Sequence, residues 1–218
     1  MIVDDHCLIR SGIKRLLEDI NDMEVIAEAG SGEETMKIVR DKSPDIILLD
    51  VKMPGIGGLE TARRLVRIHP KVKIIALSAV QQAPFPSRLL QIGAAGYLTK
   101  EAGMAELLTA IRKVMEGERY ISKDIATQIA LQSLNESPDA ESPLDVLSER
   151  ELQVMLMITN GSKVQEISEK LCLSSKTVNS YRYRLFDKLG IKNDVELTHL
   201  AMRHGLLEQS QFAETGTQ

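Results

Sequence analysis

The sequence predicts two domains, an α/β domain with a doubly wound, parallel, five-stranded sheet and then an all-α domain of four helices. In the first half of the 218-residue chain, short β-rich runs alternate with segments of helical spacing. Polar residues follow several of these runs, and the last third of the chain shows helical spacing without strand patterning. Because strand and helix alternate, we expect a parallel sheet covered by helices on both faces.

Length and composition agree with this division. A chain of 218 residues suits one domain of about 120 residues and a smaller one. Hydrophobic residues make up 43% and charged residues 27%, close to the average of soluble globular proteins. The longest apolar runs, such as Ile46 to Leu49, are far shorter than the ~20 residues of a membrane-spanning helix, and the N-terminus does not resemble a secretion signal. We therefore expect a cytoplasmic protein.

The two cysteines, Cys7 and Cys172, fall in different predicted domains. This spacing argues against a disulfide framework and against a clustered zinc site. We expect both to be small buried residues.

The elements of the first domain follow from their patterns. Besides the short run at the N-terminus, strands are expected over 23–29, 45–49, 72–78 and 95–99. Helices are expected over 8–19, 33–41, 59–69, 87–92 and 104–117. The composition then shifts, and 122–134 has the pattern of an amphipathic helix within a linker that we place at 119–145, with its polar part at 135–143.

Five polar residues stand at the carboxyl ends of the predicted strands: Asp4, Asp5, Asp50, Ser78 and Lys100. In a doubly wound sheet these ends share one edge, where ligands bind. Three carboxylates suit Mg²⁺, which prefers oxygen ligands. An aspartate can also accept a phosphoryl group, with a lysine and a hydroxyl to neutralise and bind it. Any one of these aspartates alone is as well explained as a turn residue, but their combination with Pro54-Gly55 favours a phosphoryl-transfer site.

On these residues, the segment 1–118 resembles the receiver domain of bacterial two-component response regulators, which has the flavodoxin-like (CheY-like) fold. The matching motifs are Val3-Asp4-Asp5-His6, Leu49-Asp50-Val51-Lys52-Met53-Pro54-Gly55, Leu77-Ser78-Ala79 and Gly93-Ala94-Ala95-Gly96-Tyr97-Leu98-Thr99-Lys100. The resemblance implies that Asp50 is the phosphoacceptor and that Lys100 pairs with the phosphoryl group. It implies Mg²⁺ ligands at Asp4, Asp5, Asp50 and the backbone carbonyl of Lys52. Ser78 and Tyr97 would be the switch pair, with the hydroxyl moving towards the phosphate and the ring turning inward.

The first strand departs from that family pattern. Only Met1, Ile2 and Val3 precede Asp4, about half of an average strand of ~5 to 6 residues. Either the natural start lies further upstream, which we favour, or the receiver is weakened.

The C-terminal third predicts four helices over 146–207, followed by a disordered tail at 208–218. Ser148 and Glu151 form the pattern of a capping box at the start of the first helix. A second helix is expected over 164–171, and a third begins near Ser175 as its cap and runs to Leu189. Met155 and Met157 are expected in the core, and His199 and His204 are too far apart for a metal pair on one helical face.

This third of the chain resembles the DNA-binding domain of the NarL/FixJ (LuxR-type) regulators, on Leu147-Ser148-Glu149-Arg150-Glu151, Glu166-Ile167-Ser168, Leu173-Ser174 and Lys176-Thr177-Val178-Asn179-Ser180-Tyr181. The resemblance implies base contacts from Asn179, Ser180 and Tyr183. It implies phosphate contacts from Lys176, Thr177, Arg182, Arg184 and Lys188. The last helix, over 195–205, would then join two copies in a homodimer on promoter DNA.

Three further runs are similar to the GacA/UvrY/LetA regulators: Met155-Leu156-Met157-Ile158-Thr159, Asn179-Ser180-Tyr181-Arg182-Tyr183-Arg184 and Asp194-Val195-Glu196-Leu197-Thr198-His199-Leu200. That subfamily implies a membrane-bound hybrid sensor histidine kinase of the BarA/GacS type as phosphodonor. It also implies that the target promoters are those of small regulatory RNAs.

Two other functions fit parts of the sequence. A constitutive DNA-binding regulator with a degenerate receiver agrees with the short first strand. A Mg²⁺-dependent phosphatase agrees with the acidic residues, but such enzymes use a second acid near the nucleophile, and Lys52 stands at the position two after Asp50. The chain is therefore expected to be a regulator and not an enzyme.

Overall fold

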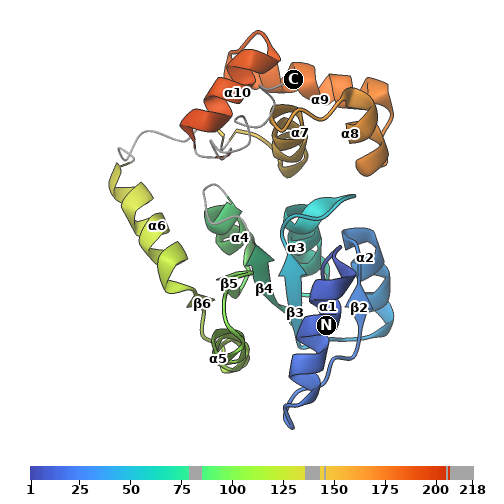
Figure 1. The fold of residues 1–218 in the computed structure, drawn as a ribbon, viewed down its shortest axis with the longest axis vertical. Helices are drawn as coiled ribbons and strands as arrows, with labels where there is room; N and C mark the ends of the chain where they lie inside the picture. The colour runs from blue at the N-terminus through green and yellow to red at the C-terminus, as the bar shows by residue number, and fades with distance from the viewer. Residues whose placement is uncertain (79–84, 136–142, 145, 205, 207–218) are drawn as a thin grey trace, which may run out of the picture. The chain divides into compact units, whose positions relative to one another are not determined.

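The computed structural model describes residues 1–78, 85–135, 143–144, 146–204 and 206. The chain divides into two compact units, Met1–Ser137 and Pro138–Gln218. Figure 1 shows the strands in the first unit and only helices in the described part of the second. The predicted tail at 208–218 and most of the polar linker lie outside the described residues.

The first unit is built on a parallel sheet of six strands in the order β2-β1-β3-β4-β5-β6. The strands are Ile2–Val3 (β1), Glu28–Ala29 (β2), Ile46–Asp50 (β3), Lys73–Ser78 (β4), Gly96–Thr99 (β5) and Tyr120–Ile121 (β6). The helices are Cys7–Glu18 (α1), Gly32–Asp41 (α2), Gly57–Ile68 (α3), Phe85–Ile92 (α4), Met104–Met115 (α5) and Lys123–Asn135 (α6). The winding reverses between β1 and β3, which makes their carboxyl ends the natural place for a ligand.

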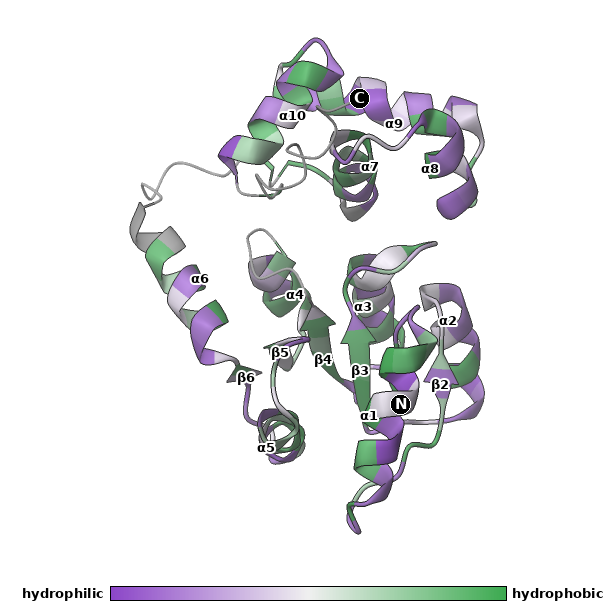
Figure 2. Ribbon diagram, viewed as in Figure 1, coloured by the Kyte–Doolittle hydropathy of each residue, from purple (hydrophilic) through white to green (hydrophobic). Residues whose placement is uncertain are grey.

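Both faces of this sheet are covered, as expected for buried parallel strands. On one face, α1 and α5 contribute Leu17, Leu107 and Ile111 to a core with Leu48 and Leu98 of the sheet. Helices α2, α3 and α4 pack side by side on the other face. The strands β3 and β4 are hydrophobic along most of their length (Figure 2) because neither face meets water.

Two strand predictions needed correction. The sheet has a sixth strand, since Tyr120 and Ile121 pair with Gly96 and Tyr97, and two residues are too short to show a pattern. The strand expected over 23–29 is reduced to Glu28 and Ala29. A strand exists only opposite a partner, and β1 offers Ile2 and Val3 alone.

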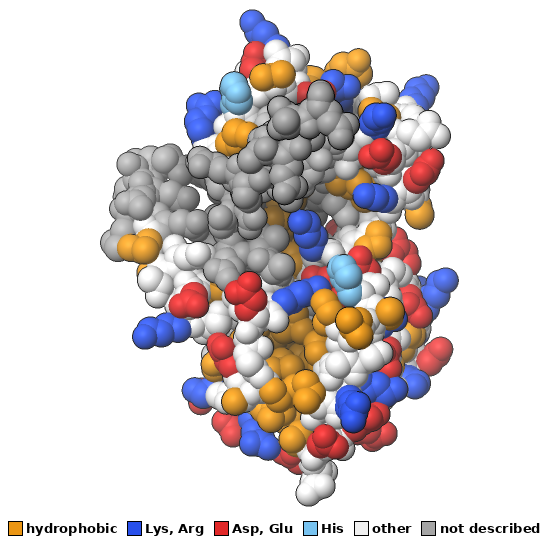
Figure 3. All heavy atoms as spheres, viewed as in Figure 1, with side chains coloured by type: hydrophobic (Ala, Val, Ile, Leu, Met, Phe, Trp, Pro, Cys, Tyr) orange, Lys and Arg blue, Asp and Glu red, His pale blue; other side chains and the backbone are white. Residues whose placement is uncertain are grey.

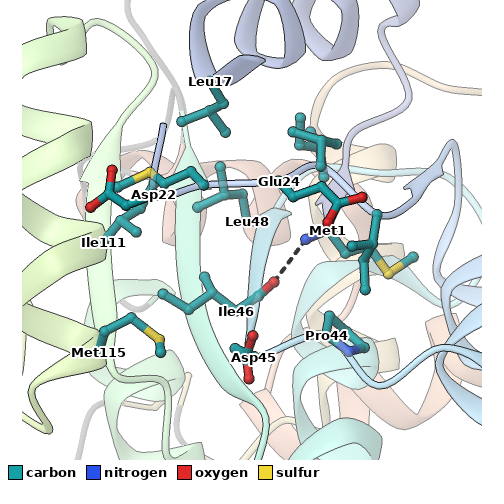
Figure 4. A pocket seen from close by; sticks show the side chains of 14 residues that line it. Met1, Leu17, Asp22, Glu24, Pro44, Asp45, Ile46, Leu48, Ile111 and Met115 are labelled. Atoms are coloured by element: carbon teal, nitrogen blue, oxygen red, sulfur yellow. Dashed lines mark hydrogen bonds between the residues drawn. The ribbon is translucent and has the colours of Figure 1, made fainter. Parts of the chain in front are cut away.

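The short β1 is nevertheless hydrogen-bonded to both neighbours. The Ile2 N–H donates to Ala27 O at 3.1 Å, and Met1 O accepts from Leu48 N at 2.9 Å. The Met1 amine donates to Ile46 O at 2.9 Å (Figure 4), and burial lowers the pKa of this amine to about 6. A pocket opens beside it, lined mainly by residues of 22–26 and 44–48, with Leu17 of α1 and with Ile111 and Met115 of α5. Hydrophobic side chains gather on that face between the two helices (Figure 3).

The second unit contains four helices in its described part: Glu149–Thr159 (α7), Val164–Lys170 (α8), Ser175–Leu189 (α9) and Asp194–Arg203 (α10). The capping box of Ser148 and Glu151 is confirmed. The cap of α9 is Ser174 and not Ser175, because the Ser174 hydroxyl accepts from Thr177 N. Across the described chain, each predicted helix is present with its ends within two residues of those expected.

The prediction of buried cysteines was wrong, since both Cys7 and Cys172 are exposed thiols. Cys7 is the first residue of α1, where the chain emerges from the sheet. Cys172 lies in the exposed turn between α8 and α9, with a φ of 51° in the left-handed region. Met155 is fully buried as expected. In the described part of the chain, none of the helices has the length and apolarity required to cross a bilayer.

Gly58 fixes the approach of α3 to the end of β3. A Cβ at Gly58 would lie 2.3 Å from Asp50 O and 2.6 Å from Val51 Cα, both backbone atoms. We expect Gly58→Ala to lower the free energy of unfolding of the first unit by about 1 to 3 kcal/mol through overpacking. The control is Gly12→Ala in α1, where a Cβ meets nothing within 4 Å, so that the change stabilises by up to about 1 kcal/mol. Thermal unfolding of both variants tests this, and equal midpoints would contradict it.

Candidate functional site: an acidic pocket and a basic helix

The predicted acidic residues meet at the carboxyl edge of the sheet. Asp50 is the last residue of β3, and Asp4 follows β1; both are 1% exposed. Asp5 is exposed beside them. One ligand atom from each of these three, and from His6, lies within 4.8 Å of the others. We refer to Asp4, Asp5 and Asp50 with Lys100 as the acidic pocket.

Lys100 connects the two buried carboxylates. Its Nζ lies 2.7 Å from Asp50 Oδ2 and 2.7 Å from Asp4 Oδ2. The lysine reaches this point because it follows β5 directly and its N–H donates to Ser78 O at the end of β4. The other oxygen of Asp50, Oδ1, accepts from Lys52 N at 3.0 Å.

These surroundings shift the pKa values of the pocket. Burial raises the pKa of Asp50 to about 6, while Lys100 and the Lys52 N–H act in the opposite direction. Partial burial disfavours the charge of Lys100, but the Asp4 and Asp50 carboxylates raise its pKa above the ordinary value. Asp50 is therefore ionised at neutral pH and more basic than an ordinary aspartate, which suits a nucleophile.

The pocket fits the divalent cation that the receiver resemblance implies. Asp4 Oδ2 is buried and receives no directed hydrogen bond from the described residues, although Lys100 lies near it. Carboxylate oxygens are the donors that Mg²⁺ prefers. Asp4, Asp5, Asp50 and the Lys52 carbonyl would hold it, and it would supply neutralisation of phosphoryl oxygens.

The predicted switch pair is brought together. Ser78 and Tyr97 are both 0% exposed, on the neighbouring strands β4 and β5. Burial raises the pKa of Tyr97 to about 12, and a hydrogen bond with the Ser78 side chain opposes that rise. The ring thus points inward, the position that the family resemblance associates with activation.

The second candidate site is α9 of the second unit. Tyr183 is 70% exposed, and Ser180 is exposed with its hydroxyl bonded to Lys176 O. Within the described residues, the side chains of Lys176, Asn179 and Tyr183 make no hydrogen bond or ion pair. The Arg184 guanidinium lies over the Tyr181 ring, 4.4 Å from its centroid. Helix α9 therefore presents both polar and basic side chains to the outside.

Comparison with known families decides what these two sites belong to. The response regulator receiver domain matches residues 1–112, and the bacterial regulatory proteins of the luxR family match residues 145–201. The chain belongs to the two-component response regulators with a LuxR-type DNA-binding domain. It is a regulator of transcription.

Relatives match nearly the whole chain. Response regulator GacA of Pseudomonas viridiflava is 56% identical over 210 residues, which cover 96% of this chain and 98% of GacA. Response regulator UvrY of Escherichia coli K12 is 56% identical over 206 residues and covers 94% of each. A solved structure of RcsB from Salmonella enterica serovar Typhimurium, bound to promoter rprA with the phosphomimetic BeF₃⁻, is 25% identical. It covers 92% of this chain and 96% of its own, with a TM-score of 0.63.

Several residues of the receiver pocket were not predicted. His6 Nδ1 lies 2.9 Å from Asp5 Oδ1 and 3.2 Å from Asp4 Oδ1. Arg10 donates to Asp4 O at 2.6 Å, and Glu33 of α2 accepts from Ile56 N at 2.9 Å in the loop that follows Asp50. Only His6 had a signal in the sequence, its position directly after the acidic pair.

In the LuxR-type domain, two of the predicted phosphate contacts are held by carboxylates. Arg182 pairs with Asp194 of α10. Lys188 Nζ lies 2.7 Å from Glu151 Oε2 and donates to Val146 O. The capping-box residue Glu151 thus also anchors the end of α9.

The Glu151 and Lys188 pair predicts a pH dependence. Burial favours the neutral acid, but Lys188 and Ser148 outweigh it and lower the pKa of Glu151 below 4.5. A lowered acid pKa stabilises the fold above the unfolded value, and this stability is lost as the pH falls through the folded pKa. We expect Glu151→Gln to destabilise the domain by about 1 to 2 kcal/mol at pH 7, and by less below about pH 4.5.

Urea unfolding of the full chain at both pH values, followed by circular dichroism, measures this difference. The control is Glu166→Gln, whose carboxylate accepts only the exposed Lys163 N–H among the described residues. A loss in Glu151→Gln that stays constant with pH would show that the ion pair contributes nothing.

Proposed function

We propose that this response regulator accepts a phosphoryl group on Asp50 from a hybrid sensor histidine kinase of the BarA/GacS type. It then binds promoter DNA in the cytoplasm as a homodimer. Receiver function is proposed for residues 1–118 and DNA binding for 146–207, joined by 119–145. The observation that carries the proposal is the buried Asp50 carboxylate, with Lys100 Nζ 2.7 Å from Oδ2.

The transfer step follows from this geometry. An Asp50 oxygen attacks the phosphorus of a phosphohistidine, an acyl phosphate bond forms and the P–N bond breaks. The leaving imidazole nitrogen takes up a proton from solvent, so that neutral histidine is released. Lys100 carries the positive charge that the incoming oxygens need. Ser78 offers its hydroxyl to one of those oxygens at the end of the neighbouring strand.

On the DNA side, α9 is proposed as the recognition helix in the major groove. Asn179, Ser180 and Tyr183 would contact base edges, while Lys176, Thr177 and Arg184 contact phosphates. Val195 and Met202 of α10 are 64% and 38% exposed, and an exposed apolar helix face supports the proposed dimer contact.

The likeness to GacA and UvrY supports the kinase type and, as target promoters, those of small regulatory RNAs. RcsB bound to promoter DNA in the presence of a phosphomimetic supports coupling of the two domains. The constitutive regulator remains the alternative, because β1 has only two residues in its ladders. A phosphatase is less well supported, since Lys52 leaves the position of a second acid unfilled.

Phosphorylation of Asp50 is tested by intact-protein mass after incubation with acetyl phosphate and Mg²⁺. We expect one phosphoryl adduct on the unmodified chain and none on Asp50→Asn, which lacks the nucleophile but keeps the side-chain shape. Asp45→Asn, an acid at the opposite end of β3, is the control and should retain the adduct. An adduct on Asp50→Asn would contradict the assignment, and no adduct on any variant would favour the constitutive regulator.

The roles on α9 are tested by electrophoretic titration of a target promoter and of random DNA at several salt concentrations. Arg184→Ala should weaken both complexes and reduce the salt slope by about one, because one phosphate contact is lost. Asn179→Ala should reduce the preference for the promoter by about 1 to 3 kcal/mol with little effect on random DNA. Equal effects of the two substitutions would contradict this placement of the recognition helix.

A further inference from the structure

Arg182 differs from the other basic residues of α9 because it forms a bidentate ion pair with a carboxylate of α10. Its Nε donates to Asp194 Oδ1 at 2.8 Å, and its Nη2 donates to Asp194 Oδ2. The guanidinium also lies 5.6 Å from the centroid of the Phe186 ring, one turn further along α9. Such a two-pronged pair fixes the position and the orientation of the arginine.

Asp194 is itself held in place. It is the first residue of α10, where the helix dipole favours a negative charge, and Asn193 caps that helix by accepting from Glu196 N at 3.0 Å. The turn between α9 and α10 is short, and it has the C-cap Gly190 at one end and the N-cap Asn193 at the other. The side chains of Arg182 and Asp194 are 33% and 40% exposed, so the pair lies at the surface of the domain.

Arg184 shows the contrast two residues away. Its guanidinium stacks on Tyr181 and donates to Ser180 O, and no carboxylate pairs with it among the described residues. Among the described residues, Arg182 therefore has a neutralising carboxylate and Arg184, on the same helix, has none.

We propose that Asp194 is a specificity-determining residue that masks the charge of Arg182 and so limits binding to DNA of unrelated sequence. This inference rests on the proposed role of α9 in binding DNA. Affinity for random DNA comes from phosphate neutralisation, and each neutralised phosphate adds about 0.9 to the slope of log K against log salt. An arginine already neutralised by Asp194 would exchange one anion for another and release little free energy.

The test compares Asp194→Asn with Asp187→Asn in the full chain. Both remove one negative charge, but Asp187 is an exposed residue of α9 that has no ion pair among the described residues. We expect Asp194→Asn to bind a random-sequence duplex several-fold more tightly and to steepen the salt slope by about one. Asp187→Asn should change the slope much less.

Arg182→Gln completes the cycle. Introduced into the unmodified chain, Arg182→Gln should leave the salt slope for random DNA unchanged. Introduced together with Asp194→Asn, it should remove the increase in affinity and in salt slope that Asp194→Asn causes alone. Equal slopes for Asp194→Asn and Asp187→Asn, or a slope reduced by about one in Arg182→Gln alone, would overturn the proposal. If Asp194→Asn fails to fold by circular dichroism, Arg182→Gln alone decides. An unmodified chain that binds neither promoter nor random DNA would instead contradict the proposed function of α9.

Discussion

The receiver depends on one ammonium group placed between two buried carboxylates. Asp4 and Asp50 are each 1% exposed, and two like charges removed from water repel strongly. Lys100 Nζ, 2.7 Å from an oxygen of each, offsets this repulsion. The strand order places Asp4, Asp50 and Lys100 at the ends of β1, β3 and β5 on one edge, so the sheet topology is what allows a single lysine to serve both acids.

The same sheet topology explains why the receiver pocket could be predicted from the sequence. Parallel strands end at one edge, so a polar residue after each apolar run is placed without knowledge of side-chain geometry. Asp50 and Lys100 were found in this way and do meet. The contacts of Arg10 and Glu33 could not be found, because they depend on how helices α1 and α2 approach the loops. The length of β2 was overestimated for a related reason, since a strand is defined by its partner and the residues 23–27 have none in the ladder.

The DNA-binding domain shows a different limit. The capping box, the helices and the basic character of α9 follow from local sequence. Local sequence does not show which of these basic residues are free to contact DNA, because the acids that neutralise them are remote in the chain. Asp194 is 12 residues from Arg182, and Glu151 is 37 residues from Lys188. Counting positive charges on α9 therefore overstates the charge that the free domain presents.

The two domains share one feature: a basic side chain that is proposed to meet a phosphate is already paired with a carboxylate. In the receiver, Lys100 pairs with Asp4 and with Asp50, the carboxylate proposed to receive a phosphoryl group. In the LuxR-type domain, Asp194 holds Arg182 on the helix proposed to meet the DNA backbone. In both places a phosphate would have to compete with a carboxylate for a cation that is already paired. Such competition lowers the net gain from each phosphate contact, so that binding follows only where further contacts add to it. In the proposed function, a phosphoryl group covalently bound to Asp50 would supply those contacts in the receiver, and base contacts from α9 would supply them on a matching promoter.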